Sequence, residues 1–234
     1  MTDKQIIVTG ASKGIGAAVA IELDRRGFDV ACLSRSGVAP VGTGYACDMT
    51  DAGAVKDTIA TCAGAGGIVG LVNNAGVHIA GSIATLDTGD YERVMALNAT
   101  SVMVAAREVY PYLKDAGGTI VNMGSFFDRM GVPDNLAYCA SKAAVAAMTR
   151  CMAVEWADDG IRAVNIAPGY VETDLNRNFL AHPKFAKWLE TRIPVSKPAQ
   201  PDEIARLVGA IFAENINSLT GETIYVDGAQ GVNH

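Results

Sequence analysis

The sequence lacks any hydrophobic run long enough to cross a membrane. Half of its 234 residues are hydrophobic, yet no apolar stretch approaches the roughly 18 unbroken residues that a membrane-spanning helix requires. We also expect no export signal, because the chain passes from Asp3 and Lys4 directly into the short apolar stretch Gln5–Val8. We therefore expect a soluble, cytoplasmic protein.

Charged residues are scarce as well, at 19% of the chain. A low charged fraction combined with high hydrophobicity excludes a disordered protein. Nineteen basic against twenty-five acidic side chains give a net charge of −6, which disfavours nonspecific binding to nucleic acids or to anionic membranes.

Histidine and cysteine are few. The three histidines, His78, His182 and His234, are far apart and have no metal-ligand spacing, so we predict no catalytic metal. The five cysteines are odd in number and lie in apolar segments, which favours reduced core residues; they are Cys32, Cys47, Cys62, Cys139 and Cys151. Cys139, beside Tyr138, could instead be a reactive thiol, but we prefer the structural interpretation.

What the sequence does contain is a regular alternation of short apolar runs and longer helical patterns. Alternation of this kind predicts βαβ units and a parallel sheet covered on both faces. We therefore expect one α/β domain over residues 1–234, doubly wound, with a parallel sheet of about seven strands. The expected strands are near 5–9, 29–33, 43–47, 68–73, 118–123, 162–167 and 223–227, and the expected helices near 14–27, 51–63, 89–114, 138–158 and 201–213.

The segment 174–200 departs from this alternation. It contains Pro183, Pro194 and Pro198 and mixes charged with large apolar side chains. Such a segment is typical either of a substrate flap over a pocket or of an ordinary surface insertion, and both interpretations stay open.

Two of the expected helices carry more apolar residues than one buried face needs. The helix from 138 is apolar almost all round, and the helix near 89–114 shows the same excess. A second subunit would cover the remaining face, so we expect a homo-oligomer, a dimer or a tetramer, built on these two helices.

A glycine-rich turn follows the first expected strand and opens the first helix. It includes Gly10, Ser12, Lys13, Gly14, Ile15 and Gly16. Glycines let a backbone approach a pyrophosphate closely, and a helix N-terminus offers free N–H groups to it. In this position the turn predicts a dinucleotide site.

The end of the second strand bears on which dinucleotide is bound. Sites that prefer NAD place an acid there, whereas this chain has Ser34 and Arg35. Arg35 could pair with a 2′-phosphate and Lys13 could flank it, although a single cation is more usually a solvated surface residue. The pair, together with the missing acid, predicts NADP(H).

The run from Ser125 through Tyr138 to Lys142 carries the chemistry. Tyr138 and Lys142 stand four residues apart, so a helix places them on one face, where the ammonium is expected to lower the phenol pKa from about 10. Ser125 follows a buried apolar run and is expected at a strand's carboxyl end, where open α/β sheets hold ligands. A Tyr-x-x-x-Lys pair alone is usually only a solvated helix pair, so the interpretation depends on the other motifs.

With these motifs in register, the chain resembles the short-chain dehydrogenase/reductase family from end to end. The resemblance implies the Rossmann-type fold of that family. Asn73-Asn74-Ala75-Gly76, Asn98, Asp48 and the segment Pro168–Thr173 match further motifs of that family. The resemblance implies that the cofactor also contacts Ser34, Asp48, Met49, Asn74, Ala75, Gly76, Tyr138, Lys142, Pro168, Gly169, Val171 and Thr173.

The resemblance also implies the catalytic roles. Tyr138 would be the general acid for ketone reduction and the base for alcohol oxidation, and Ser125 would bind the substrate oxygen. Lys142 would bind the nicotinamide ribose and lower the tyrosine pKa, while Asn98 would hold the lysine's water and a proton path.

Two departures from the family pattern affect the details. Only twelve residues separate Arg35 from Asp48, so we expect an irregular loop near 36–44 in place of a helix. Gly117-Gly118 stands where reductases of acyl-carrier-protein substrates tend to carry a basic residue, which weakens an acyl carrier as partner.

The main hypothesis is an enzyme, an NADP(H)-dependent carbonyl reductase that acts reversibly on a small-molecule ketone or secondary alcohol. One alternative is a 3-oxoacyl thioester reductase, and another is a non-catalytic dinucleotide-sensing protein. The candidates for the wall of the substrate pocket are His78, Phe126, Phe127, Met130, Tyr170, Leu175 and Phe179, each of which could equally belong to the core. Asp128 and Arg129 could meet a polar substituent of the substrate or be solvated.

Overall fold

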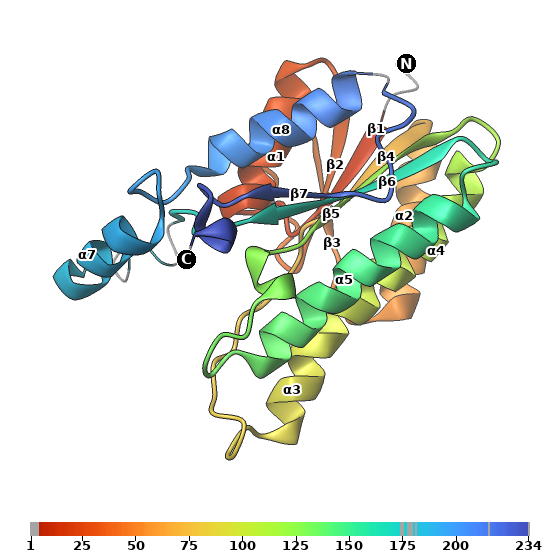
Figure 1. The fold of residues 1–234 in the computed structure, drawn as a ribbon. Helices are drawn as coiled ribbons and strands as arrows, with labels where there is room; N and C mark the ends of the chain where they lie inside the picture. The colour runs from red at the N-terminus through yellow and green to blue at the C-terminus, as the bar shows by residue number, and fades with distance from the viewer. Residues whose placement is uncertain (1–4, 174–175, 177–179, 181, 215, 234) are drawn as a thin grey trace.

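The computed structural model describes residues 5–173, 176, 180, 182–214 and 216–233. A seven-stranded parallel sheet in the order β3-β2-β1-β4-β5-β6-β7 forms its centre (Figure 1). This confirms the predicted α/β class, and the strand ranges agree to within two residues. The strands are β1 Gln5–Thr9, β2 Asp29–Ser34, β3 Thr43–Ala46, β4 Ile68–Asn73, β5 Gly118–Met123, β6 Ile161–Pro168 and β7 Thr223–Val226.

The central strands are apolar runs because both of their faces are covered. All five residues of β1 are buried, and β1 pairs in parallel with β2 on one side and β4 on the other. Chain order reverses at this pair, and in open α/β sheets such a switch point marks the crevice that binds ligands.

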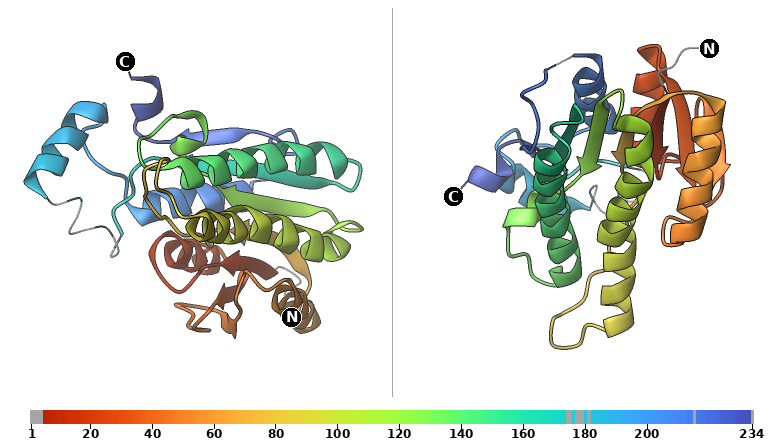
Figure 2. Two further views of the ribbon diagram at one scale, coloured as in Figure 1. Left: turned by 90° about the horizontal axis from the view of Figure 1, so that it is seen from below. Right: turned by 90° about the vertical axis from the view of Figure 1, so that its right-hand side faces the viewer.

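Helices cover both faces of the sheet, as Figure 2 shows. On one face α1 and α8 pack on β1 and its neighbours, and on the other face lie α2, α4 and α5. The helices are α1 Gly14–Arg25, α2 Ala52–Ala65, α3 Thr88–Met95, α4 Ser101–Leu113, α5 Leu136–Glu155, α7 Pro183–Arg192 and α8 Pro201–Ala213.

The expected helix 89–114 is not continuous. A π-helical turn, η1 (Ala96–Thr100), separates α3 from α4. Regular apolar spacing did not reveal this turn, which contains Asn98. A helix in the 174–200 segment, α7, was not predicted either; Pro183 occupies its first turn, where the missing N–H costs little.

The loop between β2 and β3 is irregular, which confirms the prediction for the shortened connection. Gly42 has a φ of +65°, and a Cβ there would lie 2.1 Å from the carbonyl oxygen of Val30. The tight approach of this loop to β2 therefore requires glycine.

The interpretation of all five cysteines as core residues is wrong in part. Cys32, Cys47 and Cys62 are buried, but Cys139 is half-buried and Cys151 is exposed on α5. The apolar pattern around Cys151 covers more of the helix than one sheet face can bury. Burial raises the pKa of Cys139, which disfavours a reactive thiolate.

Within the described parts of the chain, no helix is long and apolar enough to cross a bilayer. The same residues contain no group of three or more His, Cys, Asp or Glu side chains arranged to hold a metal ion.

Candidate active site

The glycine-rich turn at the end of β1 forms a cradle with no room for a side chain at Gly10 or Gly16. Gly10 has a φ of +66°, and a Cβ on Gly16 would lie 2.3 Å from the carbonyl oxygen of Gly10. Lys13, the N-cap of α1, makes no side-chain capping bond, so the first N–H groups of the helix stay available. This geometry fits the pyrophosphate of a dinucleotide.

Asn74 and Thr9 hold the cradle in place. The Asn74 side chain donates to the carbonyl oxygens of Thr9, at 3.0 Å, and Gly10, at 3.2 Å. The Thr9 hydroxyl accepts from the backbone N–H groups of Asn74 and Ala75, both at 3.0 Å. The ends of β1 and β4, distant in sequence, are thereby locked together.

The residues predicted for the adenine end lie around the tip of β2. Ser34 and Met49 are buried, whereas Arg35 and Lys13 are exposed. The Asp48 carboxylate accepts from the N–H and hydroxyl of Thr50 at 2.9 and 2.8 Å. These bonds, with a smaller contribution from the charge of Arg35, lower the pKa of Asp48.

Ser125 and Tyr138 meet at the carboxyl end of β5. Ser125 precedes the 3₁₀ turn η2 (Phe126–Arg129), and its hydroxyl accepts from the N–H of Phe127 at 3.3 Å. Tyr138 lies in the first turns of α5. Burial raises the pKa of Tyr138 to about 12, against the lowering effect of its hydrogen bond with Ser125.

Lys142 is buried one turn further along α5. Its ammonium donates to the carbonyl oxygen of Met123 at 2.7 Å and lies 5.5 Å from the centroid of the Tyr138 ring. Burial lowers the pKa of Lys142 to about 8. The predicted lowering of the tyrosine pKa is therefore wrong for this structure, because burial of the phenol outweighs a cation that points to the end of β5.

Asn98 projects from the π-helical turn and clamps the backbone of Val77 in both directions. Its side-chain oxygen accepts from the N–H of Val77 at 2.8 Å, and its side-chain nitrogen donates to the Val77 carbonyl at 2.9 Å. The same nitrogen donates to the Ser141 hydroxyl at 3.2 Å, which donates to the Tyr138 carbonyl at 2.8 Å. Short π-helical turns of this kind are frequent at functional sites.

Sequence reasoning missed Ser141, which joins Asn98 to Tyr138. The one available signal was a serine between Tyr138 and Lys142, in a helix rich in apolar residues. That signal did not indicate which residue on another helix it contacts.

The segment after β6 passes over the cradle. A Cβ on Gly14 would lie 3.6 Å from the methyl group of Thr173, while a Cβ on Gly169 would lie 2.7 Å from the Cα of Asp227. Pro168 and Val171 are buried beside them. Of the predicted cofactor residues in this segment, Thr173 thus lies next to the glycine turn.

Comparison with known proteins agrees with this geometry. The model of a family described as enoyl-(acyl carrier protein) reductase matches residues 10–232. Glucose 1-dehydrogenase of Gluconobacter oxydans is 36% identical over 244 aligned residues, which cover 96% of this chain and 91% of the relative. The chain belongs to the short-chain dehydrogenase/reductase family. Members of this family bind a nicotinamide dinucleotide and act as oxidoreductases.

Two further proteins are similar to this chain over nearly its whole length. The 3-oxoacyl-[acyl-carrier-protein] reductase MabA of Mycobacterium tuberculosis is 31% identical, and the match covers 99% of this chain and 94% of that protein. The crystal structure of a gluconate 5-dehydrogenase from Burkholderia cenocepacia, in complex with NADP and tartrate, has a TM-score of 0.92 at 27% identity, covering 100% of this chain and 97% of that chain.

A chain of aromatic contacts surrounds Tyr138 in this short-chain dehydrogenase/reductase. The rings of His78 and Phe127 lie 5.1 and 5.9 Å from the Tyr138 ring, both nearly perpendicular to it. Phe126 contacts Phe127 and Tyr170, and Tyr170 contacts Phe185 and Trp188 of α7. Of the other wall candidates, Met130 is half-buried, and Leu175 and Phe179 lie outside the described residues.

Asp128 and Arg129 make contacts within the protein, and Arg129 is also exposed, so a role in meeting a polar substituent stays a prediction. Asp128 accepts from the Tyr225 hydroxyl at 3.0 Å, and the Arg129 guanidinium lies 3.6 Å from the centre of the Tyr225 ring. Arg129 also lies 3.7 Å from the Asp227 carboxylate. Because Tyr225 and Asp227 are about a hundred residues away in sequence, loop composition alone could not reveal these partners.

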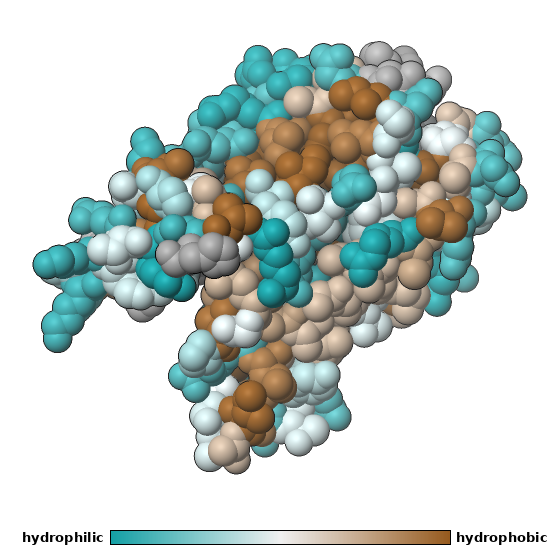
Figure 3. Space-filling model, viewed as in Figure 1, coloured by the Kyte–Doolittle hydropathy of each residue, from teal (hydrophilic) through white to brown (hydrophobic). Residues whose placement is uncertain are grey.

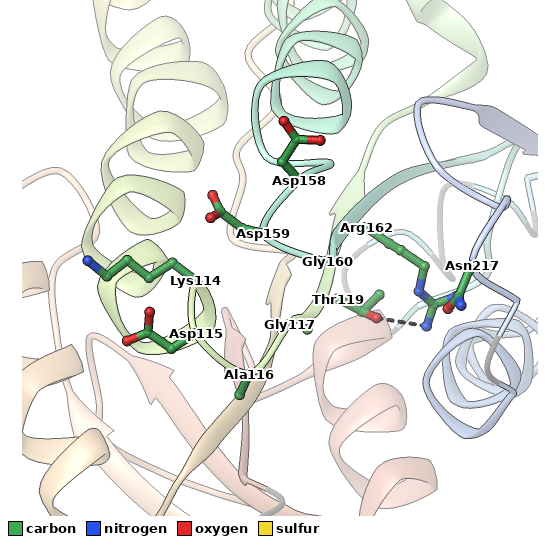
Figure 4. A pocket seen from close by; sticks show the side chains of 11 residues that line it. Lys114, Asp115, Ala116, Gly117, Thr119, Asp158, Asp159, Gly160, Arg162 and Asn217 are labelled. Carbon is green, nitrogen blue, oxygen red and sulfur yellow. Dashed lines mark hydrogen bonds between the residues drawn. The ribbon is translucent and has the colours of Figure 1, made fainter.

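A separate hollow of about 510 Å³ lies at the opposite end of the strands, lined mainly by the loops that lead into β5 and β6 (Figure 4). None of the predicted site residues lines it. Arg162, its most buried charged residue, donates to the Thr119 hydroxyl at 2.9 Å and to the Ile216 carbonyl at 3.0 Å. Arg162 thus ties strands and loops together at the amino ends of the strands, away from the cradle.

Proposed function

We propose that this protein is an NADP(H)-dependent oxidoreductase that reduces a ketone to a secondary alcohol and can run in reverse. The observation that carries the proposal is the convergence of Ser125, Tyr138 and Lys142 at the carboxyl end of β5. The glycine cradle lies at the same edge of the sheet, at the switch point between β1 and β4.

The proposed chemistry divides between cofactor and protein. The bound cofactor would supply a hydride, with its electron pair, to the carbonyl carbon. Ser125 and Tyr138 would donate hydrogen bonds to the carbonyl oxygen, where negative charge grows. The Tyr138 O–H bond would then break, its proton completing the alcohol, and the charge of Lys142 would stabilise the phenolate until solvent returns a proton.

The protonation state of Tyr138 supports the role of an acid. A pKa of about 12 keeps the phenol protonated at neutral pH, so the proton needed for ketone reduction is in place. Asn98 would act through Ser141 as a positioning residue, since its bonds reach the backbone of Tyr138.

Replacing Tyr138 with Phe tests the proposal directly. We expect kcat for ketone reduction to fall by about 10²–10⁴-fold, because the proton donor is lost, while NADPH still binds. Turnover and fluorescence titration of NADPH measure the two effects. Tyr112→Phe, the same change at an exposed tyrosine of α4, is the control. Substantial turnover in Tyr138→Phe would refute the assigned role, and no turnover by the native protein would favour a non-catalytic dinucleotide-sensing protein.

The preference for NADP(H) is supported by Arg35 and Lys13, both exposed near the cradle, and by the absence of an acid at the end of β2. The gluconate 5-dehydrogenase structure with bound NADP is consistent with it. We expect NADPH to bind the native protein more tightly than NADH. Arg35→Ala should weaken the affinity for NADPH by roughly 10- to 100-fold, because a charge-assisted hydrogen bond is lost. NADH binding should change little in that variant. Side-by-side titrations measure this, with Arg93→Ala on α3 as the control; equal losses for both cofactors would contradict the proposal.

A second candidate is reduction of a 3-oxoacyl thioester. The MabA relative and the family description favour it, whereas Gly117-Gly118 lacks the basic residue expected for an acyl carrier. Comparing kcat/KM for an acetoacetyl thioester with that for free ketones distinguishes the two candidates.

We further propose a cytoplasmic homo-oligomer, a dimer or tetramer. Val154 on α5 is 80% exposed and Met103 on α4 is 40% exposed, although other apolar residues that suggested the contact, such as Val145 and Val102, are buried in the core. The part of α5 before Val154 carries small residues that would allow close approach of a second subunit: Ala140, Ala143 and Ala147.

A further inference from the structure

The ring of Tyr138 is approached by two side chains of different chemistry. The His78 imidazole meets it at an interplanar angle of 88° and the Phe127 ring at 86°. A substrate whose carbonyl oxygen reaches Tyr138 therefore has a polar ring and an apolar ring within its own length. Neither ring is needed for proton transfer, so both are free to select among substrates.

The hydrogen bonds of Asn135 determine which nitrogen of His78 carries the proton. Asn135 donates from its side-chain nitrogen to the carbonyl oxygen of Pro133 at 2.6 Å. Its other side-chain atom, an oxygen, therefore faces Nε2 of His78 and can only accept. Nε2 must be the donor, and in the neutral imidazole Nδ1 is left as an acceptor. No hydrogen bond to Nδ1 is found within the described part of the chain.

The surroundings of His78 hold its backbone in place. The preceding residue, Val77, is clamped by Asn98 through two hydrogen bonds. A few residues later the N–H of Gly81 donates to the Asp134 carbonyl at 2.8 Å, so the loop after β4 is joined to the loop before α5. Because its backbone is already held, the ring loses little conformational entropy when a substrate binds.

The apolar ring is held equally well. Phe127 is 9% exposed and Phe126 is 3% exposed, and the contacts of Phe126 with Tyr170 extend this wall to α7. Hydrocarbon placed against these rings loses contact with water, which favours an uncharged carbon substituent.

We propose that the substrate is a hydroxy ketone, with a hydroxyl group near the carbonyl that donates to Nδ1 of His78 and a carbon substituent that packs on Phe127. This inference rests on the proposed function and specifies its substrate. The corresponding alcohol would be a diol or polyol. In this arrangement His78 is a residue of substrate specificity and not of proton transfer.

The test compares hydroxyacetone with butan-2-one, which differ by a hydroxyl in place of a methyl group. The readout is the ratio of their kcat/KM values in each variant relative to the native protein, because this cancels the difference in intrinsic reactivity. His78→Phe keeps an aromatic ring and removes the acceptor, so the ratio should fall about tenfold, as expected for one partly exposed hydrogen bond. His78→Gln keeps an acceptor and should recover part of the ratio.

His182→Phe, the same change at the exposed histidine before α7, should leave the ratio unchanged. A ratio for His78→Phe within about twofold of the native value would overturn this inference but not the proposed function, since loss of a hydrogen bond should change the ratio by more than twofold. Failure of the native protein to reduce either ketone would overturn the proposed function and this inference with it.

Discussion

At the scale of single residues, burial sets the charge of the two groups at the centre of the site. It raises the pKa of Tyr138 to about 12 and lowers that of Lys142 to about 8, because a charged form is disfavoured away from water. Near neutral pH the phenol is therefore neutral and the ammonium mostly charged. A donor and a stabilising cation coexist over this range.

The pH dependence of ketone reduction should follow Lys142. Its positive charge is present below about pH 8 and is lost above it, whereas Tyr138 keeps its proton to about pH 12. We expect kcat/KM to decline as pH rises through about 8, and Lys142→Arg, where active, to lose this decline because a guanidinium stays charged. Rate profiles measure it, with Lys114→Arg as the control. A native rate profile that is flat to about pH 10 would contradict the role of the Lys142 charge, because Lys142 would then lose its charge without any change in rate.

At the scale of elements, a glycine of α8 packs against a cluster of charged side chains at the end of α1. Glu22 of α1 accepts from Arg25 and Arg26, each at 2.7 Å. Gly209 of α8 has no side chain where a Cβ would lie 2.5 Å from the Arg26 guanidinium and 2.9 Å from the Cγ of Glu22. The buried carboxylate is thus paired and enclosed by the neighbouring helix.

Glu22→Gln should lower the melting temperature at pH 7, by roughly 2–4 °C if about 1 kcal/mol is lost. The hydrogen bonds with Arg25, followed by Arg26, lower the pKa of Glu22 to about 2 from 4.5. The stabilisation is therefore complete above about pH 4.5 and disappears as pH falls through about 2.

Thermal melts of both proteins at pH 7 and near pH 3 would show the native advantage shrinking as the carboxylate takes up protons. Asp24→Asn, an exposed acid on the same helix, should change little at either pH. An advantage of the native protein that does not depend on pH would mean that packing, and not charge, is the cause.

At the scale of the whole molecule, two apolar areas remain uncovered. Figure 3 shows one as a pale band along α5 and a second, more strongly apolar area between α8 and β7. β7 is an edge strand whose residues are all half-buried, and an edge strand left in water is a site where other chains can pair. Two separate faces are consistent with a tetramer.

We expect size-exclusion chromatography with light scattering to give a dimer or tetramer at micromolar concentration. Val154→Asp, which places a charge on the α5 face, should shift the mass towards smaller species because an unpaired charge is costly to bury. Lys56→Asp on α2, away from both faces, serves as the control. A native protein that elutes as a monomer would refute this prediction.

The sequence by itself determined the sheet, the glycine cradle and the spacing of Ser125, Tyr138 and Lys142. These features depend on neighbours along the chain: apolar runs that bury both faces, glycines where a Cβ would clash, and side chains one helical turn apart. Local periodicity is sufficient for them.

Only the tertiary structure decided the contacts between distant segments. The π-helical turn places Asn98 against Val77, Lys142 reaches the Met123 carbonyl, and Asp128 is engaged by Tyr225. His78 meets Tyr138 from a loop sixty residues earlier. The raised pKa of Tyr138 and the lowered pKa of Lys142 follow from the same cause, because desolvation depends on which segments fold over a group and not on its neighbours in sequence.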